Sequence, residues 1–367
     1  MPTVEPSGSR VLVTGANGYI AMWVIRVLLE QGYMIRGVVR SLEKGKHIKE
    51  YFSSYGDKME LFVVEDMAKE GAFDDAVKDV DAIEHLATLV TLYGIDPDEY
   101  IRPALHGTLG VLQSALKFGQ APVKRIIITS SVAAIYNPVT EHTGTVTFDE
   151  TSWGDENVEV VKEKGRDAGP IAKYSASKTL AEKAAWDFYK KHKNEIKWDM
   201  LALHPPFVFG PTLQKVKKPD DMNASMKNFF WDMITKEMPD DVLQDTFSFV
   251  DVRDVADAHV LALKIAKAAG ERIVIANKSS TWQGLRDLIQ KLQPQLYTSG
   301  ILPRGKPDLD QMIKFKYNAD KGTRILGMQY ISEEKMVSDV LADFKARGWL
   351  EKRADALYRK VEPVAAN

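Results

Sequence analysis

Cysteine is absent from the 367 residues of this sequence. Its absence excludes a disulfide framework, a thiolate nucleophile and any metal site built on cysteine. The histidines show no pair at metal-ligand spacing, so we expect no metal site. No apolar run approaches the roughly 18 residues of a membrane span. Residues 1–9 lack the pattern of a secretion signal and predict a loose tail. We expect a cytoplasmic protein without a membrane partner.

An excess of charge of one sign is also missing. The 49 lysines and arginines nearly balance the 51 acidic residues, for a formal charge of −2. This balance argues against nucleic acid or an anionic surface as a partner. We find no internal repeat and no low-complexity segment. The hydrophobic fraction of 45% suffices for a sizeable core, and the length fits one large α/β unit or two closely associated domains.

A glycine turn follows the first predicted strand. Residues 10–14 form an apolar run typical of a buried strand, and residues 22–30 predict a helix. Between them, Gly15 allows a tight turn and Gly18 allows the backbone to approach a pyrophosphate, with Ala21 as the third small residue. The N-terminus of the helix offers free N–H groups and a positive dipole to such an anion.

Strand and helix patterns then alternate along the chain. Further strands are predicted at residues 35–39, 60–64, 82–86, 123–129 and 197–203, with helices at 102–118 and 171–191. We expect the polar stretch 136–164 to be irregular. The alternation predicts an α/β fold with a doubly wound parallel Rossmann sheet and right-handed crossovers.

The pattern changes after Pro205. Prolines, glycine and a charged loop precede an aromatic-rich helix predicted at 222–236, and more helices are predicted at 282–292 and 333–347. A strand at 272–276 is expected to rejoin the sheet. We therefore predict a dinucleotide-binding domain of residues 10–204 plus 272–276, and a smaller mixed substrate-binding lobe of residues 205–271 and 277–367.

A tyrosine and a lysine stand four residues apart on the helix predicted at 171–191. At this spacing, Tyr174 and Lys178 leave the same face of the helix. A neighbouring cation stabilises a phenolate, so we expect Lys178 to lower the pKa of Tyr174 toward values that suit a proton donor.

Six short segments carry a resemblance to a known family. They are residues 13–21 (VTGANGYIA), 64–67 (VEDM), 129–131 (TSS), 174–178 (YSASK), 208–211 (VFGP) and 250–256 (VDVRDVA). In this order they resemble the extended short-chain dehydrogenases/reductases. The resemblance is closest to the dihydroflavonol reductase and cinnamoyl-CoA reductase branch, near the fungal methylglyoxal and aldehyde reductases. It covers most of the chain.

The resemblance implies a carbonyl reductase with three catalytic residues. Ser131 follows the fifth strand, at the sheet edge where open α/β folds bind ligands, and would hydrogen-bond the substrate carbonyl. Family position favours it over the neighbouring Ser130. Tyr174 would donate the proton, and Lys178 would lower its pKa and hold the nicotinamide ribose. The hydride would come from the cofactor.

We expect NADPH as the cofactor, because Arg40 ends the second strand where NAD-binding proteins carry an acid. A guanidinium there, with Lys44 four residues on, favours a 2′-phosphate. The resemblance places Asp66 and Met67 near the adenine. The full set implied for the cofactor is Gly15, Asn17, Gly18, Tyr19, Ile20, Arg40, Lys44, Asp66, Met67, Ala87, Tyr174, Lys178, Pro205, Val208 and Ser225.

The substrate is expected to be a small aldehyde or ketone with an apolar or aromatic group. Apolar pocket candidates are Leu89, Val90, Val132, Phe207 and Met226. His106 stands where relatives often have asparagine; it would line the site or relay a proton, or, as we favour, pack within its helix. We expect a monomer or a homodimer.

Two other functions are open. A sugar-nucleotide epimerase or dehydratase would use the same fold, but it normally retains NAD and needs a polar lobe, which Arg40 and the aromatic helix argue against. A non-catalytic NADP-sensing module would be expected to lose Tyr174 or Lys178, and both are present.

Overall fold

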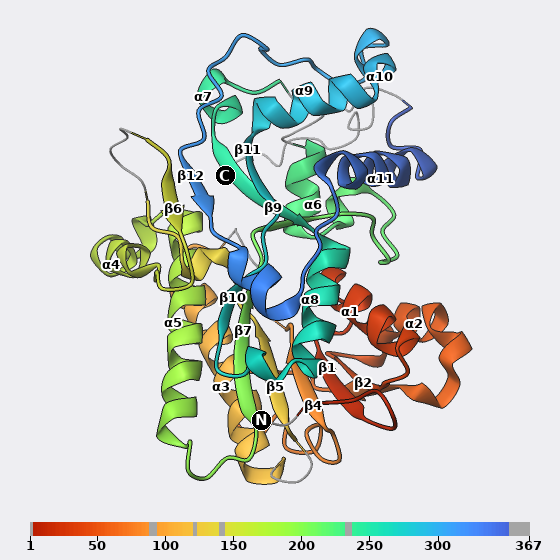
Figure 1. Cartoon of the computed structure of the whole chain (residues 1–367), viewed down its shortest axis with the longest axis vertical. Coiled ribbons are helices and arrows are strands. Elements are labelled where there is room, and N and C mark those ends of the chain that lie inside the picture. The colour runs from red at the N-terminus through yellow and green to blue at the C-terminus, as the bar shows by residue number, and fades with distance from the viewer. Residues whose placement is uncertain (1–2, 88–93, 120–122, 139–143, 232–236, 352–367) are drawn as a thin grey trace, which may run out of the picture.

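Seven parallel strands form the main sheet. A computed structural model describes residues 3–87, 94–119, 123–138, 144–231 and 237–351 (Figure 1). The strands are β1 (Arg10–Thr14), β2 (Met34–Val39), β3 (Met59–Val63), β4 (Ala82–His85), β5 (Arg125–Thr129), β7 (Asp199–His204) and β10 (Arg272–Val274). Their order is β10-β7-β5-β4-β1-β2-β3, and every neighbouring pair is parallel. The predicted sheet is confirmed, including the late strand that rejoins it.

Helices cover both faces of this sheet. Alternate side chains of β1 point to opposite faces, so Val11 and Val13 belong to one core cluster and Leu12 to the other. On one face α1 (Tyr19–Glu30) packs along α8 (Val252–Lys264), near α2 (Leu42–Tyr51). On the other face α3 (Asp98–Phe118) packs along α5 (Pro170–Lys191) (Figure 1). The sheet is therefore doubly wound, as expected.

Two small sheets lie beyond the main one. β8 (Phe207–Phe209) pairs in parallel with β9 (Thr246–Asp251), which pairs antiparallel with β11 (Lys278–Thr281). β6 (Val146–Phe148) pairs in parallel with β12 (Phe315–Tyr317). Aromatic side chains pack on the sheet of β8, β9 and β11, where the rings of Phe247 and Trp282 stack with centroids 3.5 Å apart. A smaller mixed sheet is thus present, although its individual strands were not predicted.

The remaining helices are α4 (Asp155–Lys164), α6 (Ala224–Asn228), α7 (Asp240–Leu243), α9 (Trp282–Leu292), α10 (Pro294–Thr298) and α11 (Glu333–Ala346). The expectation of an irregular stretch at 136–164 is wrong, because it contains β6 and α4. α4 is mostly polar and buries only a narrow face that includes Val158 and Val161 against α5. The predicted aromatic helix begins at Ala224, and α6 continues into a π-helical turn at 229–231; residues 232–236 lie outside the described residues, so the end of this helix stays a prediction.

Candidate active site

The glycine turn between β1 and α1 has the geometry that the sequence predicts. Gly15 has φ +65, and a Cβ placed there would lie 3.0 Å from the Cα of Ala87. A side chain at Gly15 would therefore strain the backbone and crowd the segment that contains Ala87. Gly18 precedes α1, and no side chain caps the first N–H groups of this helix. Uncapped N–H groups at a helix N-terminus suit an anion.

Two residues of this turn brace it against the segment that follows β8. The backbone oxygen of Asn17 accepts a hydrogen bond of 2.7 Å from Gln214. The buried hydroxyl of Tyr19 donates to the backbone oxygen of Gly210 at 2.8 Å. The side chain of Tyr19 is therefore engaged in structure. Ile20 is half-buried and packs against the main core.

Two exposed cations stand just past β2: Arg40 directly follows the strand, and Lys44 lies in the first turn of α2. The hydroxyl of Ser41 caps α2 by accepting from the backbone N–H of Lys44 at 3.4 Å. Within the described part of the chain, neither Arg40 nor Lys44 forms an ion pair, whereas nearby Lys46 pairs with Glu43 at 2.5 Å. Both cations are thus free to meet an anionic ligand, as the NADPH prediction requires.

Residues near the predicted adenine site have structural contacts of their own. Asp66 is exposed and accepts a hydrogen bond of 2.9 Å from the backbone N–H of Ala68, as a turn residue does. Met67 packs against the core of the α3 and α5 face. The backbone N–H of Ala87 donates to the hydroxyl of Thr14 at 3.0 Å. Contact of Asp66, Met67 and Ala87 with a cofactor stays a prediction.

The other predicted cofactor residues lie past β7. Pro205 directly follows this strand, and its backbone oxygen accepts from the N–H of Val132 at 3.1 Å. Val208 is buried in β8, and Ser225 is half-buried on α6. These three residues also remain predictions for cofactor binding.

The three residues predicted to be catalytic, Ser131, Tyr174 and Lys178, come together where the turn after β5 packs on α5, and we refer to them by that prediction as the catalytic cluster. The hydroxyl of Ser131 lies close enough to that of Tyr174 to lower the pKa of the tyrosine. Ser131 also accepts from the backbone N–H of Ala133 at 3.1 Å, which fixes its side chain. The ammonium of Lys178 donates to the backbone oxygen of Thr129 at 3.5 Å. Two chain segments more than 40 residues apart in sequence thus place a hydroxyl pair beside a buried cation.

Burial controls the ionisation of this cluster. It raises the pKa of Tyr174, and the nearby Ser131 hydroxyl offsets only part of that rise. Burial also lowers the pKa of Lys178 to about 8. The expectation that Lys178 lowers the pKa of Tyr174 is therefore wrong for this structure, because desolvation of the phenol dominates. A raised pKa keeps Tyr174 protonated at neutral pH, which is the state of a proton donor.

The two adjacent serines have different partners. Ser130 donates to the buried carboxylate of Glu182 at 2.5 Å, so its hydroxyl is engaged inside the fold. Ser131 is the serine that meets Tyr174. Sequence reasoning missed Glu182, although its place four residues after Lys178 was a signal that it shares the face of that lysine.

A small polar cavity of about 20 Å³ lies beside Lys178. Its lining includes His85, Thr108 and Glu182. His85 hydrogen-bonds the hydroxyl of Thr14 at 3.1 Å. Burial, with a contribution from the charge of Lys178, lowers the pKa of His85 to about 3. His85 is therefore a neutral, packed residue next to the cluster.

The structure describes three of the five residues predicted to line the substrate pocket. Val132 and Phe207 are half-buried, Val132 directly after Ser131 and Phe207 in β8. Met226 is fully buried in the main core. Leu89 and Val90 lie outside the described residues. A pocket made by these residues stays a prediction.

His106 differs from its expected packing. It is exposed on α3, while Ala104, Gly107 and Thr108 of the same helix are buried. The favoured expectation of a packed histidine is wrong, because Ala104, Gly107 and Thr108 share the buried face of α3 and position 106 lies on the opposite side of the helix.

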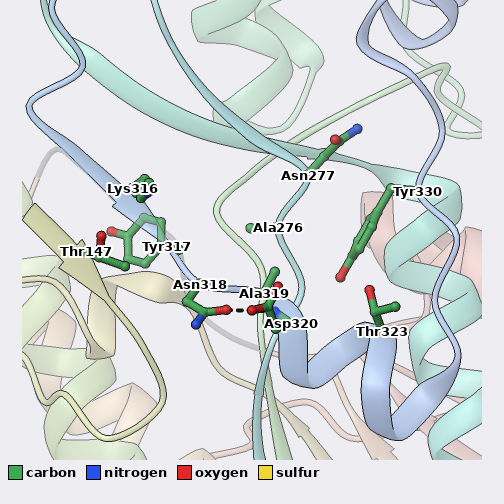
Figure 2. Close-up of a pocket in the computed structure, with 10 residues that line it drawn as sticks. All are labelled: Thr147, Ala276, Asn277, Lys316, Tyr317, Asn318, Ala319, Asp320, Thr323 and Tyr330. Carbon is green, nitrogen blue, oxygen red and sulfur yellow. Dashed lines mark hydrogen bonds between the residues drawn. The ribbon is translucent and has the colours of Figure 1, made fainter. Parts of the chain in front are cut away.

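A larger cavity of about 410 Å³ opens between β12, η7 (Gly322–Leu326) and the end of β10 (Figure 2). Its lining includes Lys316, Asp320 and Tyr330, and contains none of the predicted site residues. In the ranges that the structure covers, no group of three or more histidine, aspartate or glutamate residues suits a metal ion. Over the same ranges, no helix combines the length and apolar character needed to cross a bilayer.

Known proteins resemble this chain over most of its length. A putative NADPH-dependent methylglyoxal reductase of Candida albicans is 34% identical over 92% of this chain and 98% of its own. An NADPH-dependent methylglyoxal reductase of Saccharomyces cerevisiae is 30% identical over 90% of this chain and 96% of its own. The solved structure of the Candida albicans reductase Gre2 in complex with NADPH covers 92% of this chain and 99% of its own, with 30% identity and a TM-score of 0.82. Residues 11–276 match the NAD dependent epimerase/dehydratase family, and the chain belongs to that family.

Proposed function

We propose that this protein is an NADPH-dependent reductase that converts aldehydes or ketones to alcohols. The observation that carries the proposal is the close approach of the Ser131 and Tyr174 hydroxyls beside buried Lys178, whose ammonium donates to the backbone oxygen of Thr129. This group lies at the carboxyl edge of a parallel sheet, where open α/β folds bind their ligands. Two relatives, 34% and 30% identical over nearly their whole lengths and named as NADPH-dependent methylglyoxal reductases, support the same reaction.

The catalytic cluster fits the chemistry of carbonyl reduction. NADPH supplies a hydride when it is bound. Ser131 donates a hydrogen bond to the carbonyl oxygen, which polarises the carbonyl and stabilises the charge that develops there. Tyr174, protonated at neutral pH, delivers its proton to that oxygen. Lys178 would hold the ribose hydroxyls of the bound cofactor and would stabilise the phenolate that Tyr174 leaves behind.

Two features of the structure fit the cofactor. The glycine turn is packed closely at Gly15 and Gly18, where a Cβ would lie 3.0 Å from the Cα of Ala87 and from the backbone oxygen of Gly15 respectively, and the turn stands next to the uncapped end of α1. Arg40 and Lys44 form no ion pair within the described residues and stand just past β2, where a 2′-phosphate is read. Their positive charge favours NADPH over NADH.

A screen of NADPH oxidation over aldehydes, α-dicarbonyls and aryl ketones tests the proposal. We expect turnover with at least one of these classes and weaker turnover with NADH. A nucleoside-diphosphate sugar serves as the competing arm. Conversion of that sugar without net NADPH oxidation would contradict the reductase and favour an epimerase.

We also propose a cytoplasmic location, a monomer or homodimer, and a substrate lobe that begins at residue 205. β10 does return to the main sheet, and the mixed sheet of β8, β9 and β11 supports a separate lobe. α8, within the proposed lobe, nevertheless packs along α1 of the main sheet. A fluorescent fusion, light scattering and limited proteolysis test these three points.

A further inference from the structure

Glu182 continues the line of the catalytic cluster along α5. Tyr174, Lys178 and Glu182 follow one another at intervals of four residues and share one face of the helix. Glu182 is only 2% exposed. The mechanism above uses the first two residues and leaves the third, a buried carboxylate, unexplained.

Four donors surround this carboxylate. Oε2 accepts from Ser130 at 2.5 Å and lies 2.7 Å from Nε2 of His204. Oε1 accepts from Arg272 at 2.7 Å and from Trp186 at 3.1 Å. Burial opposes ionisation, but His204, Arg272 and Ser130 hold the pKa of Glu182 well below its usual range. Glu182 is therefore a buried anion with both oxygens satisfied.

These partners connect Glu182 to the residue that meets the substrate. Ser130 directly precedes Ser131 at the end of β5, and His204 directly precedes Pro205 at the end of β7. The backbone oxygen of Pro205 in turn receives the hydroxyl of Ser131 at 3.5 Å. Glu182 thus ties the ends of two neighbouring strands together below Ser131.

Glu182 also acts on Lys178 through its charge. Both residues line the polar cavity of about 20 Å³, which is space for about one water. Burial lowers the pKa of Lys178, and the charge of Glu182 opposes that shift. The other titratable or charged groups around this lysine are Tyr174 on α5, His85 on β4, His204 on β7, Arg272 on β10 and, beyond Thr129, the buried pair of Glu84 and His259. Within this set the anion nearest to Lys178 along α5 is Glu182.

We propose that Glu182 is a positioning residue for carbonyl reduction, which keeps the ammonium of Lys178 charged and fixes Ser131 through Ser130. The inference rests on the proposed function. Glu182 touches neither substrate nor cofactor in this role. Its contribution is an electrostatic field at Lys178 and a fixed place for the end of β5.

The pH profile of kcat/KM separates this role from a purely structural one. Glu182→Gln keeps the size of the side chain and removes its charge. We expect the alkaline limb, where Lys178 loses its proton, to move to lower pH by about one unit. Glu182→Asp retains the charge and should keep the limb of the wild type even if the plateau falls. Ser130→Ala removes one hydrogen bond to Glu182 and is the matched control, with a lower plateau and an unmoved limb.

A direct titration of Lys178 makes the test independent of turnover. NMR of ¹³C-labelled lysine, with the Lys178 signal assigned through Lys178→Met, reports its pKa without substrate. A lower pKa in Glu182→Gln supports the inference even if the wild type reduces no carbonyl, in which case only the proposed function fails. An unchanged pKa and parallel pH profiles would overturn it.

A second variant, expected to shift the pKa of Lys178 in the opposite direction, tests the inference if Glu182→Gln does not fold. Arg272→Gln removes one of the two basic partners of Glu182 and leaves His204 in place, so the negative field at Lys178 strengthens. The titration of Lys178 should then move to higher pH. No movement in this variant would also overturn the inference.

Discussion

Lys178 and Lys44 carry the same charge in opposite surroundings. Lys178 is 7% exposed in the catalytic cluster, and burial lowers its pKa to about 8. Lys44 stands exposed in the first turn of α2, beside exposed Arg40. In a buried site charges interact strongly and titrate near neutral pH, whereas at the surface salt screens them over about 10 Å at 0.1 M.

This difference teaches where each kind of substitution should act. Changes in the catalytic cluster should alter turnover and pH dependence, because they remove a group from a fixed site built around a buried lysine. Changes at the exposed pair should alter cofactor affinity and its salt dependence, and leave the chemical step intact. The predictions below test this contrast.

The largest effect is expected for Tyr174→Phe. The change removes one hydroxyl and little volume, so the fold and the cofactor site should survive. General acid catalysis is typically worth roughly 10²–10⁴-fold, and we expect kcat to fall by about that factor. NADPH affinity, measured by direct titration, should change little. Near-normal turnover in this variant would disprove the assigned acid.

The two serines at the end of β5 should differ. Ser131→Ala removes the donor that faces the carbonyl, and loss of one such donor costs on the order of 10²–10³ in kcat. Ser130→Ala loses only its contact with Glu182 and should cost less. Steady-state kinetics of the two variants side by side give the ranking. The reverse order would mean that the roles of the serines are exchanged.

At the exposed pair, Arg40→Ala should weaken NADPH binding. A hydrogen bond to a charged group is worth about 1.5–3 kcal/mol, and every 1.4 kcal/mol or so is tenfold, so we expect a loss of roughly 10- to 100-fold. NADH affinity should barely change, because NADH has no 2′-phosphate. Titration of the free enzyme with both nucleotides measures the difference.

Lys44→Ala is the matched variant for this test. It should act in the same direction but less, since a flexible ammonium lacks the bidentate geometry of a guanidinium. For both variants the NADPH deficit should shrink at high salt. Equal losses for NADH and NADPH would show that Arg40 supports the structure and does not read the phosphate.

Features encoded over a few residues could be predicted from the sequence. The glycine turn is encoded locally, since within it Gly15 has the positive φ and Gly18 directly precedes α1. The shared face of Tyr174 and Lys178 follows from one helical turn. The apolar runs of buried parallel strands were equally visible, so all strands of the main sheet were found.

Features that depend on residues far apart in the sequence could not be predicted. Glu182 gains its donors from β5, β7 and β10, up to 90 residues away in sequence. The direction of the Tyr174 pKa shift was missed because the degree of burial is not written in a local pattern. β11 is rich in serine and α4 is rich in charge, so neither shows the apolar periodicity that marks a strand or a helix.

The smallest effect we predict concerns His85, on the buried side of the comparison. Burial lowers its pKa from 6.5 to about 3 in the folded protein. As the pH falls below 6.5, His85 binds a proton in the unfolded chain but stays neutral in the folded protein. The stability contributed by neutral His85 is therefore complete above the unfolded pKa and is lost as the pH falls toward the folded one. The loss amounts to about 1.4 kcal/mol per pH unit, or tenfold in the unfolding equilibrium.

His85→Asn removes this proton while it keeps a polar side chain near Thr14. The variant should be less stable than the wild type at neutral pH, because its hydrogen bond to the Thr14 hydroxyl is altered. Between about pH 6 and pH 5, its free energy of unfolding should nevertheless fall less steeply than that of the wild type. The two slopes should differ by about 1.4 kcal/mol per pH unit. Urea unfolding at the two pH values measures the slope, and His106→Asn at an exposed position controls for the loss of a histidine as such. Equal slopes for His85→Asn and the wild type would mean that His85 takes up its proton in the folded protein, and that burial does not control ionisation beside Lys178.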